Sequence, residues 1–152
     1  MAKVALLRST SARHLIYSVD EGVGPGRPNR RSDVLLVQYF LRESFKGTPK
    51  FQREPFPEVV KVDGVAGRQT FAAIDHFQKV LKKGGSSIAT DGRVDPVAGD
   101  QTHGAISGTQ YTIIFLNQGF SVARPGDWPR VSRAGDCPGD LRPLLVEPEF
   151  VK

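Results

Sequence analysis

The residues best suited to acid–base or metal chemistry are spread thinly along this chain. Its histidines are His14, His76 and His103, and none has a second histidine at the helical spacing that a zinc site needs. Asp75 stands next to His76, but neighbouring side chains on a helix diverge, so the two do not converge on one substrate. No nucleophile elbow is present either. We therefore expect a protein that is not an enzyme and that needs no metal or cofactor.

The cysteine and the carboxylates are the remaining groups capable of catalysis. Cys137 is the only cysteine, so no internal disulfide forms, and its turn-rich surroundings AGDCPGDLRP contain no base that would activate it. Its sequence context indicates a passive thiol. A pair of carboxylates for glycoside hydrolysis stays open, because such pairs are assembled in space and leave no fixed spacing in the sequence.

Residues suited to binding are concentrated in a repeated segment. VDGVAGRQTFAAI begins at position 62 and VDPVAGDQTHGAI at position 94, and nine of the 13 aligned positions are identical. In the first copy Asp63 can accept hydrogen bonds from backbone N–H groups two residues on, while Gly64 allows a positive φ. Pro96 replaces that glycine in the second copy. We expect Asp91-Gly92, just upstream, to form the turn there.

Helices should position these turns. A helix is predicted to begin at Ser32 or Asp33, whose side chains suit the first turn, and to fade near Gly47. A second, amphipathic helix is predicted from about Gly67 to Lys82, before two glycines. Beyond it the pattern favours a short helix near Gln101–Ile106 and a longer one near Thr109–Gln118, capped by Gly119.

The rest of the chain is less regular. Residues 1–20 contain two short apolar runs that favour an extended arm or a small hairpin. Residues 21–31 form a loop by composition, and the three prolines in 48–60 favour an irregular or extended excursion. After Phe120 five prolines indicate an ordered wrap or a tail without regular structure.

Three groups of residues recur in the order of a known family pattern. They are an opening helix with Asp33-Val34, Gln38 and Leu41; a central unit with Val62-Asp63-Gly64, Gly67, Thr70, Ala73-Ile74 and Phe77-Gln78; and a third unit with Asp91-Gly92, Val94, Gly99 and Thr102. In this the chain resembles the peptidoglycan-binding domain, a three-helix module attached to many bacterial and phage cell-wall hydrolases. The resemblance covers about residues 22–118. It departs from the family in the long segment before Val62, in the inserted residues 95–98, and in the tail.

The resemblance implies a mainly α fold, a small three-helix bundle with pseudo-repeat loops and irregular or short β extensions. Its segments would be an N-terminal arm over 1–21, the peptidoglycan-binding-like domain over 22–118, and a proline-rich C-terminal extension over 119–152. It also implies a shallow groove beside the loops. The residues placed there are Asp63, Gly64, Arg68, Gln69, Asp91, Arg93 and Gln101.

In that groove the arginines would pair with stem-peptide carboxylates and the glutamines would bond amides. The alternative stays open that the Asp and Gly residues only build turns and that the others cap helices or face water. Trp128 has two readings as well, a platform for a sugar face or packing of the tail onto the helices. Arg27, Arg30 and Arg31 either bind a phosphate or wall polymer or solvate their loop.

The expected function is therefore non-catalytic binding of bacterial cell-wall peptidoglycan. The alternative is a structural or docking component of a phage tail or contractile secretion apparatus, with protein partners. The net charge of +5 suits an anionic partner, but nucleic acid is not expected because basic and aromatic residues do not interleave. No apolar run is long enough to insert in a membrane, and no secretory signal is recognisable. We expect synthesis in the cytoplasm and action at the wall or within a secreted or phage assembly.

Overall fold

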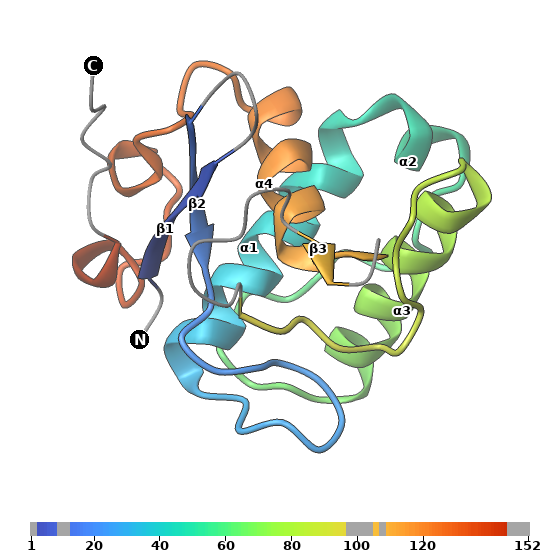
Figure 1. Ribbon diagram of the computed structural model, residues 1–152. Helices are drawn as coiled ribbons and strands as arrows, with labels where there is room; N and C mark the ends of the chain where they lie inside the picture. Colours follow the sequence, from blue (N-terminus) through green and yellow to red (C-terminus); the bar gives the residue numbers. More distant parts are fainter. Residues whose placement is uncertain (1–2, 9–12, 97–104, 107–108, 146–152) are drawn as a thin grey trace.

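The computed structural model describes residues 3–8, 13–96, 105–106 and 109–145, and within them the protein is mainly helical, as predicted (Figure 1). The helices are α1 (Arg31–Gly47), α2 (Pro49–Arg53), α3 (Arg68–Lys83) and α4 (Thr112–Ala123). The strands are β1 (Lys3–Arg8), β2 (Arg13–Ser18), β3 (Ala105–Ile106) and β4 (Thr109–Gln110), and the 3-10 turns are η1 (Val131–Arg133) and η2 (Arg142–Leu144).

Helix α1 is the centre of the core. Its residues from Asp33 to Leu41 are all buried, on every face of the helix, because other elements surround it. Phe120 of α4 packs against Tyr39 and Phe40 with ring centroids 5.3 and 4.7 Å away. Burial of these aromatic rings supplies a large share of the apolar area that holds the two helices together.

The crossing of α1 and α4 depends on small residues. A Cβ atom on Gly119 of α4 would lie 2.3 Å from Ser44 Oγ, and one on Gly47 would lie 2.5 Å from the Cβ of Ala123. The expectation that Gly119 ends the helix was therefore wrong. The helix continues to Ala123, and the glycine is there because the backbones approach closely.

Replacement of Gly119 by alanine should consequently destabilise the protein by about 1–3 kcal/mol through overpacking. Helix propensity alone would give the opposite sign, a gain of about 1 kcal/mol. Urea unfolding followed by circular dichroism measures the difference. Gly126→Ala is the matched control, since a Cβ at Gly126 meets no atom within 4 Å and should leave stability nearly unchanged. A stabilised Gly119→Ala variant would contradict the close crossing.

Helix α3 agrees with the prediction and α2 does not. α3 begins after Gly67 and ends before Gly84, one residue from the predicted bounds. The segment 48–60 was expected to be irregular, but residues 49–53 form α2. Pro49 is compatible with a helix there because it occupies the first turn, where its missing N–H has no helical partner anyway. Phe51 anchors α2 by stacking on Phe77 of α3.

The N-terminal segment forms the small hairpin that was one of the two expectations. β1 and β2 pair antiparallel from Lys3↔Ser18 to Arg8↔Arg13. The side-chain amide of Asn117 on α4 then ties the hairpin to the helices: Tyr17 N donates to its Oδ1 and its Nδ2 donates to Tyr17 O, both at 2.8 Å.

Two further expectations need correction. Ala105–Ile106 is not the end of a short helix but a strand that pairs with Thr109–Gln110, and the start of that expected helix lies outside the described residues. α4 accordingly begins at Thr112. Asp33 does not cap its own helix. Its carboxylate is buried and accepts from Asp20 N and Glu21 N, so it fixes the chain that enters α1.

The C-terminal extension is an ordered wrap as far as residue 145. Val131, Leu141 and Leu145 are buried in the same hydrophobic cluster as Ile16 and Tyr17 of the hairpin. Side chains from the arm, the helices and the tail therefore share one core.

Candidate functional site

The first Asp–Gly loop is built around a buried glutamine of α1. Gln38 Nε2 donates to Asp63 Oδ1 (3.1 Å), Val65 O (3.0 Å) and Thr70 Oγ1 (3.0 Å). Its Oε1 accepts from the N–H groups of Asp63 and Gly64 at 3.0 and 2.8 Å. Asp63 Oδ1 also accepts from Val65 N, which closes the turn. One amide thus joins α1, the loop and the first turn of α3.

The second loop repeats this construction on the next pair of helices. Gln78 of α3 donates through Nε2 to Asp91 Oδ1 (3.3 Å), Arg93 O (3.0 Å) and Thr112 Oγ1 of α4 (2.9 Å). Its Oε1 accepts from Gly92 N at 2.8 Å, and Asp91 Oδ1 accepts from Arg93 N. The expectation that Asp91-Gly92 takes over the turn of the second copy is confirmed. In space, Asp91 rather than Asp95 corresponds to Asp63.

Gly64 shows why the first turn needs glycine. Its φ is +77°, a left-handed conformation that a side chain disfavours. A Cβ there would also lie 2.6 Å from a guanidinium nitrogen of Arg31, which donates to Asp63 O at 2.7 Å. The arginine covers the turn, so Gly64 is buried and offers no surface to a ligand.

Four of the predicted groove residues lie at one junction, the first loop and the start of α3: Asp63, Gly64, Arg68 and Gln69. Gln69 is occupied within the protein. Its Oε1 accepts from Lys61 N at 2.8 Å, and its Nε2 donates to Val59 O at 3.2 Å. Hydrogen bonds from Val65 N and Gln38 hold the pKa of Asp63 below its ordinary value against the opposing effect of burial. Both side chains shape the loop.

The other predicted residues lie in the second loop or outside the residues that the structure describes. An N-terminal segment covers that loop: Val23 and Val94 exchange two backbone hydrogen bonds, and Arg27 Nε donates to Asp95 at 2.7 Å. Arg93 Nε donates to Pro25 O in the same segment. Gln101 lies outside the described residues.

What remains open at the first junction is a small mixed surface. Val59 and Val65 are 77% and 63% exposed, two of the three large apolar side chains exposed among the described residues. Lys61 and Arg68 are exposed beside them, and neither makes an ion pair or side-chain hydrogen bond with another described residue. We call Val59, Lys61, Val65 and Arg68 the first-loop surface. It combines apolar contact area with positive charge. Lys61 also acts on the exposed carboxylate of Asp63, whose pKa it helps to lower, so Arg68 is the charge without a partner among the described residues.

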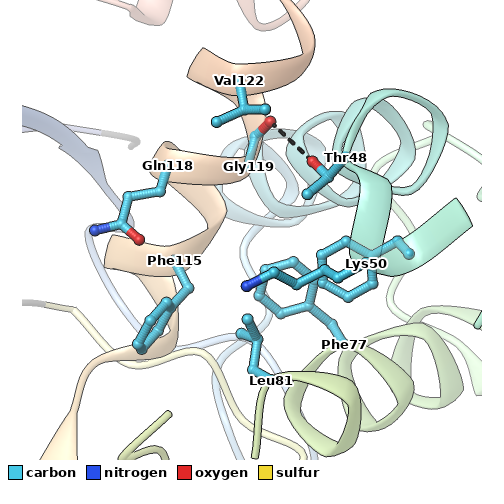
Figure 2. Close-up of a pocket in the computed structure, with 9 residues that line it drawn as sticks. Thr48, Lys50, Phe77, Leu81, Phe115, Gln118, Gly119 and Val122 are labelled. Carbon is cyan, nitrogen blue, oxygen red and sulfur yellow. Dashed lines mark hydrogen bonds between the residues drawn. The ribbon is translucent and has the colours of Figure 1, made fainter. Parts of the chain in front are cut away.

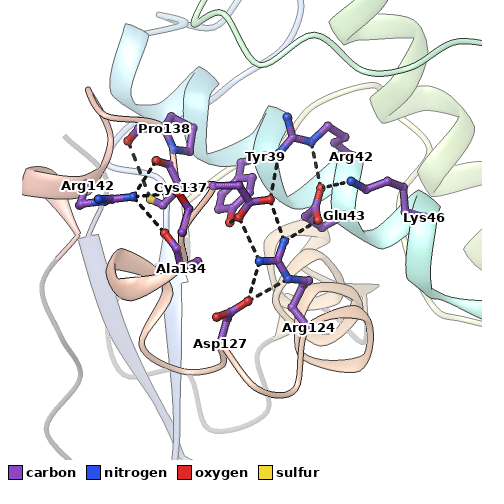
Figure 3. Close-up of polar contacts among 12 residues, drawn as sticks. Tyr39, Arg42, Glu43, Lys46, Arg124, Asp127, Ala134, Cys137, Pro138 and Arg142 are labelled. Atoms are coloured by element: carbon purple, nitrogen blue, oxygen red, sulfur yellow. Dashed lines mark hydrogen bonds and ion pairs between the residues drawn. The ribbon is translucent and has the colours of Figure 1, made fainter.

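The strongest electrostatic cluster lies elsewhere, where α1 meets the end of α4 and the tail (Figure 3). Arg124 NH1 donates to Glu43 Oε1 at 2.7 Å and to Asp136 Oδ2 at 2.9 Å. Tyr39 OH donates to the other oxygen of Asp136 at 2.7 Å. Arg124 also binds Asp127. Each charged group has a partner of opposite sign, so the cluster stabilises the contact of α1 with α4 and the C-terminal tail.

The pKa shifts follow from these contacts. Hydrogen bonds from Arg124 and Tyr39 outweigh burial and hold the pKa of Asp136 well below its usual range. Burial opposes ionisation of Glu43, but hydrogen bonds from Arg42, Arg124 and Lys46 still leave its pKa lowered. Burial and the neighbouring carboxylate raise the pKa of Tyr39, which keeps the phenol neutral and able to donate. None of these groups is poised to exchange a proton near neutral pH.

A hollow between α2, α3 and α4 is the feature that the sequence did not reveal (Figure 2). It measures about 440 Å³, including its open mouth. The residues that line it are Thr48, Lys50, Phe51, Phe77, Leu81, Phe115, Gln118, Gly119 and Val122. The only sequence signal was an aromatic residue after Pro49 in a segment that prolines otherwise marked as irregular.

No protein-family model matches the chain, and comparison with curated proteins and with solved structures finds no significant match.

The remaining chemically interesting residues have structural contacts. Cys137 is buried, and burial raises the pKa of its thiol, which disfavours the reactive thiolate. His76 Nε2 lies 2.7 Å from Glu54 O, and its ring packs against both Phe45 and Phe56, which stack on each other. Trp128 packs edge-on against Tyr17 with the ring centroids 5.8 Å apart, which agrees with the packing alternative for this residue and not with a sugar platform.

The arginine trio also makes internal contacts. Arg27 pairs with Asp95, Arg30 with Asp20 and Glu21, and Arg31 with Asp140. Within the described part of the chain no three His, Cys, Asp or Glu side chains form a group able to hold a metal ion. No described helix has the length and apolar character needed to cross a membrane.

Proposed function

We propose that this protein is a non-catalytic module of the peptidoglycan-binding type, which contacts the cell wall through its first-loop surface. The observation that carries the proposal is the unpaired Arg68 beside exposed Val59 and Val65, on a loop fixed in place by Gln38 and Gln69. A preformed loop with free charge suits recognition because little ordering entropy is lost on binding.

The chemistry of the wall fits this surface. A stem peptide presents carboxylates, and an arginine guanidinium binds a carboxylate through two parallel hydrogen bonds. The valines would cover apolar parts of the same ligand. Of the seven residues that the sequence predicted, the proposed interface keeps Arg68. Gln69 and Arg93 already form hydrogen bonds within the protein, and Arg31 covers Gly64.

The three-helix family fold belongs to the same proposal. Its support is the matched pair of loops, in which Gln38 and Gln78 each join a helix, an Asp–Gly turn and a threonine of the next helix. Such a pair is what duplication of one supersecondary unit would produce.

Sedimentation with purified, insoluble peptidoglycan tests the function. The wild-type protein should sediment with the wall at low salt and retain part of its binding at high salt, since attraction by net charge alone is screened there. Arg68→Glu should weaken binding by about tenfold, equivalent to about 1.4 kcal/mol. Arg130→Glu makes the same charge change at an exposed arginine away from the loop and should have little effect. Equal losses in both variants, or a protein that stays in the supernatant, would refute the proposal.

A structural or docking role in a larger assembly is the second proposal, and the hairpin supports it. β1 pairs only with β2, which leaves the outer edge of β1 without a strand among the described residues. An open edge can accept a strand from another chain. A ring or higher oligomer on size-exclusion chromatography with light scattering would favour this role, and a monomer would count against self-assembly.

A further inference from the structure

The floor and walls of the hollow between α2, α3 and α4 are apolar. Phe51 and Phe77 are fully buried and stack with ring centroids 4.9 Å apart and an angle of 14° between the planes. Leu81 and Phe115 extend this floor, and Val122, 57% exposed, stands at the mouth. A ligand lying here would cover the one large apolar side chain that the described part of α4 exposes.

Polar side chains stand at the rim of the hollow on both the α2 side and the α4 side. Thr48 Oγ1 donates to Gly119 O at 3.5 Å, so it is engaged within the protein. Lys50 and Gln118 are exposed, and their side chains make no hydrogen bond or ion pair with another described residue. Figure 2 shows Lys50 extending from α2 over the hollow. No acidic residue lines the site.

We infer that the hollow binds a small amphiphile that has an apolar chain and one carboxylate. The chain covers Val122 and the half-buried Phe115 above the stacked phenylalanines, and burial contributes about 25 cal/mol for each Å² of apolar surface removed from water. The carboxylate lies at the rim, where the Lys50 ammonium is the unpaired charge. Without its open mouth the hollow measures about 140 Å³, less than the roughly 300–1,000 Å³ usual for small-ligand pockets, so it suits a single slender chain.

This site is separate from the first-loop surface. Arg68 begins α3 and Leu81 lies near its end. Thirteen residues of helix place them about 20 Å apart along the axis. α2, which supplies Lys50 and Phe51, belongs to the long segment before Val62 in which the chain departs from the peptidoglycan-binding pattern. Binding in the hollow therefore does not depend on wall binding, and either can fail alone.

Titration of the ¹⁵N-labelled protein with sodium octanoate, followed by NMR, tests the inference. We expect saturable shifts at amides of α2, the end of α3 and α4. Lys50→Glu should weaken octanoate binding by at least about tenfold, and Val122→Glu should weaken it too by placing a negative charge at the mouth. Lys82→Glu is the matched control, because Lys82 is an exposed lysine of α3 that does not line the hollow. It should bind octanoate like the wild type.

Two further ligands separate charge recognition from apolar contact. Octylammonium has the same chain and the opposite charge, and 1-octanol has no charge. Both should bind more weakly than octanoate to the wild type, and Lys50→Glu should reverse the order of octanoate and octylammonium. Absence of saturable binding, equal binding of all three ligands, or equal losses in Lys50→Glu and Lys82→Glu would each overturn the inference.

Discussion

Gln38→Leu is expected to lower the free energy of unfolding by about 3 kcal/mol or more, since a buried polar group that loses its partner costs about 1–3 kcal/mol. The amide of Gln38 takes part in five hydrogen bonds with Asp63, Gly64, Val65 and Thr70, and its side chain is 1% exposed. Leucine fills a similar volume but leaves the N–H of buried Gly64 and the hydroxyl of Thr70 without this partner. Urea unfolding at neutral pH measures the loss.

Three comparison variants make this result specific. Gln118→Leu changes the same residue type at an exposed position and should alter stability by less than about 0.5 kcal/mol. Gln38→Glu keeps an acceptor for the two loop N–H groups but turns a buried carboxylate oxygen toward Asp63 Oδ1 and Val65 O, so it should be at least as destabilising as Gln38→Leu. Gln78→Leu should resemble Gln38→Leu, because Gln78 has the same role in the second loop. A loss below 1 kcal/mol for Gln38→Leu would show that the loop does not depend on this amide.

The sequence predicted the two turns because an Asp–Gly turn is a local pattern with few conformations. The glutamines that hold the turns lie at different separations from them, 25 residues for Gln38 and Asp63 and 13 for Gln78 and Asp91, so their role was visible only in the structure. The long helices were predictable from a local pattern too, since the apolar periodicity of α1 and α3 extends over several turns. α2 was missed because prolines suggest irregular structure, whereas its stability comes from a tertiary contact between Phe51 and Phe77.

Contacts between distant residues explain the other differences. Gly119 has the sequence signature of a helix end, and only the approach of Ser44 from α1 shows why it lies inside α4. Arg68 and Arg93 were both expected to pair with carboxylates of a ligand. Arg93 is bonded to Pro25, 68 residues earlier in the chain, while Arg68 remains unpaired among the described residues. No local pattern distinguishes the two arginines, so the open surface could be identified only in three dimensions.

Arg124→Met is the second large effect we expect, a loss of about 2–3 kcal/mol. Removal of one partner from a buried ion pair typically costs about 3–5 kcal/mol, because the other charge stays in the interior uncompensated. The loss here should be smaller. Glu43 is 2% exposed but keeps Arg42 and Lys46 as partners, and Arg124 itself is 24% exposed. Methionine preserves the apolar stem, so the change isolates the guanidinium group.

The pH dependence of this loss follows from the direction of the pKa shifts. Glu43 and Asp136 have pKa values lowered in the folded state, so their contribution is complete above the unfolded-state pKa of about 4 and is lost as pH falls toward the folded values. In Arg124→Met both pKa values should rise toward or above the ordinary range. The carboxylates then protonate at higher pH, and the gap in stability between wild type and variant should narrow between pH 7 and pH 3. A gap that stays constant would mean that the guanidinium acts only through packing.

A double variant separates the charge of Arg124 from its position at the end of α4. If the penalty in Arg124→Met arises from an uncompensated carboxylate, then Arg124→Met with Glu43→Met should be more stable than the single variant, since apolar replacement of a buried pair is often neutral or favourable. The remaining loss would then come from Asp136, whose side chain is 43% exposed and can be solvated. Additive losses in the double variant would instead show that Glu43 stabilises the fold through Arg42 and Lys46, independently of Arg124. Thermal and urea unfolding of the four proteins at pH 7 distinguishes these outcomes.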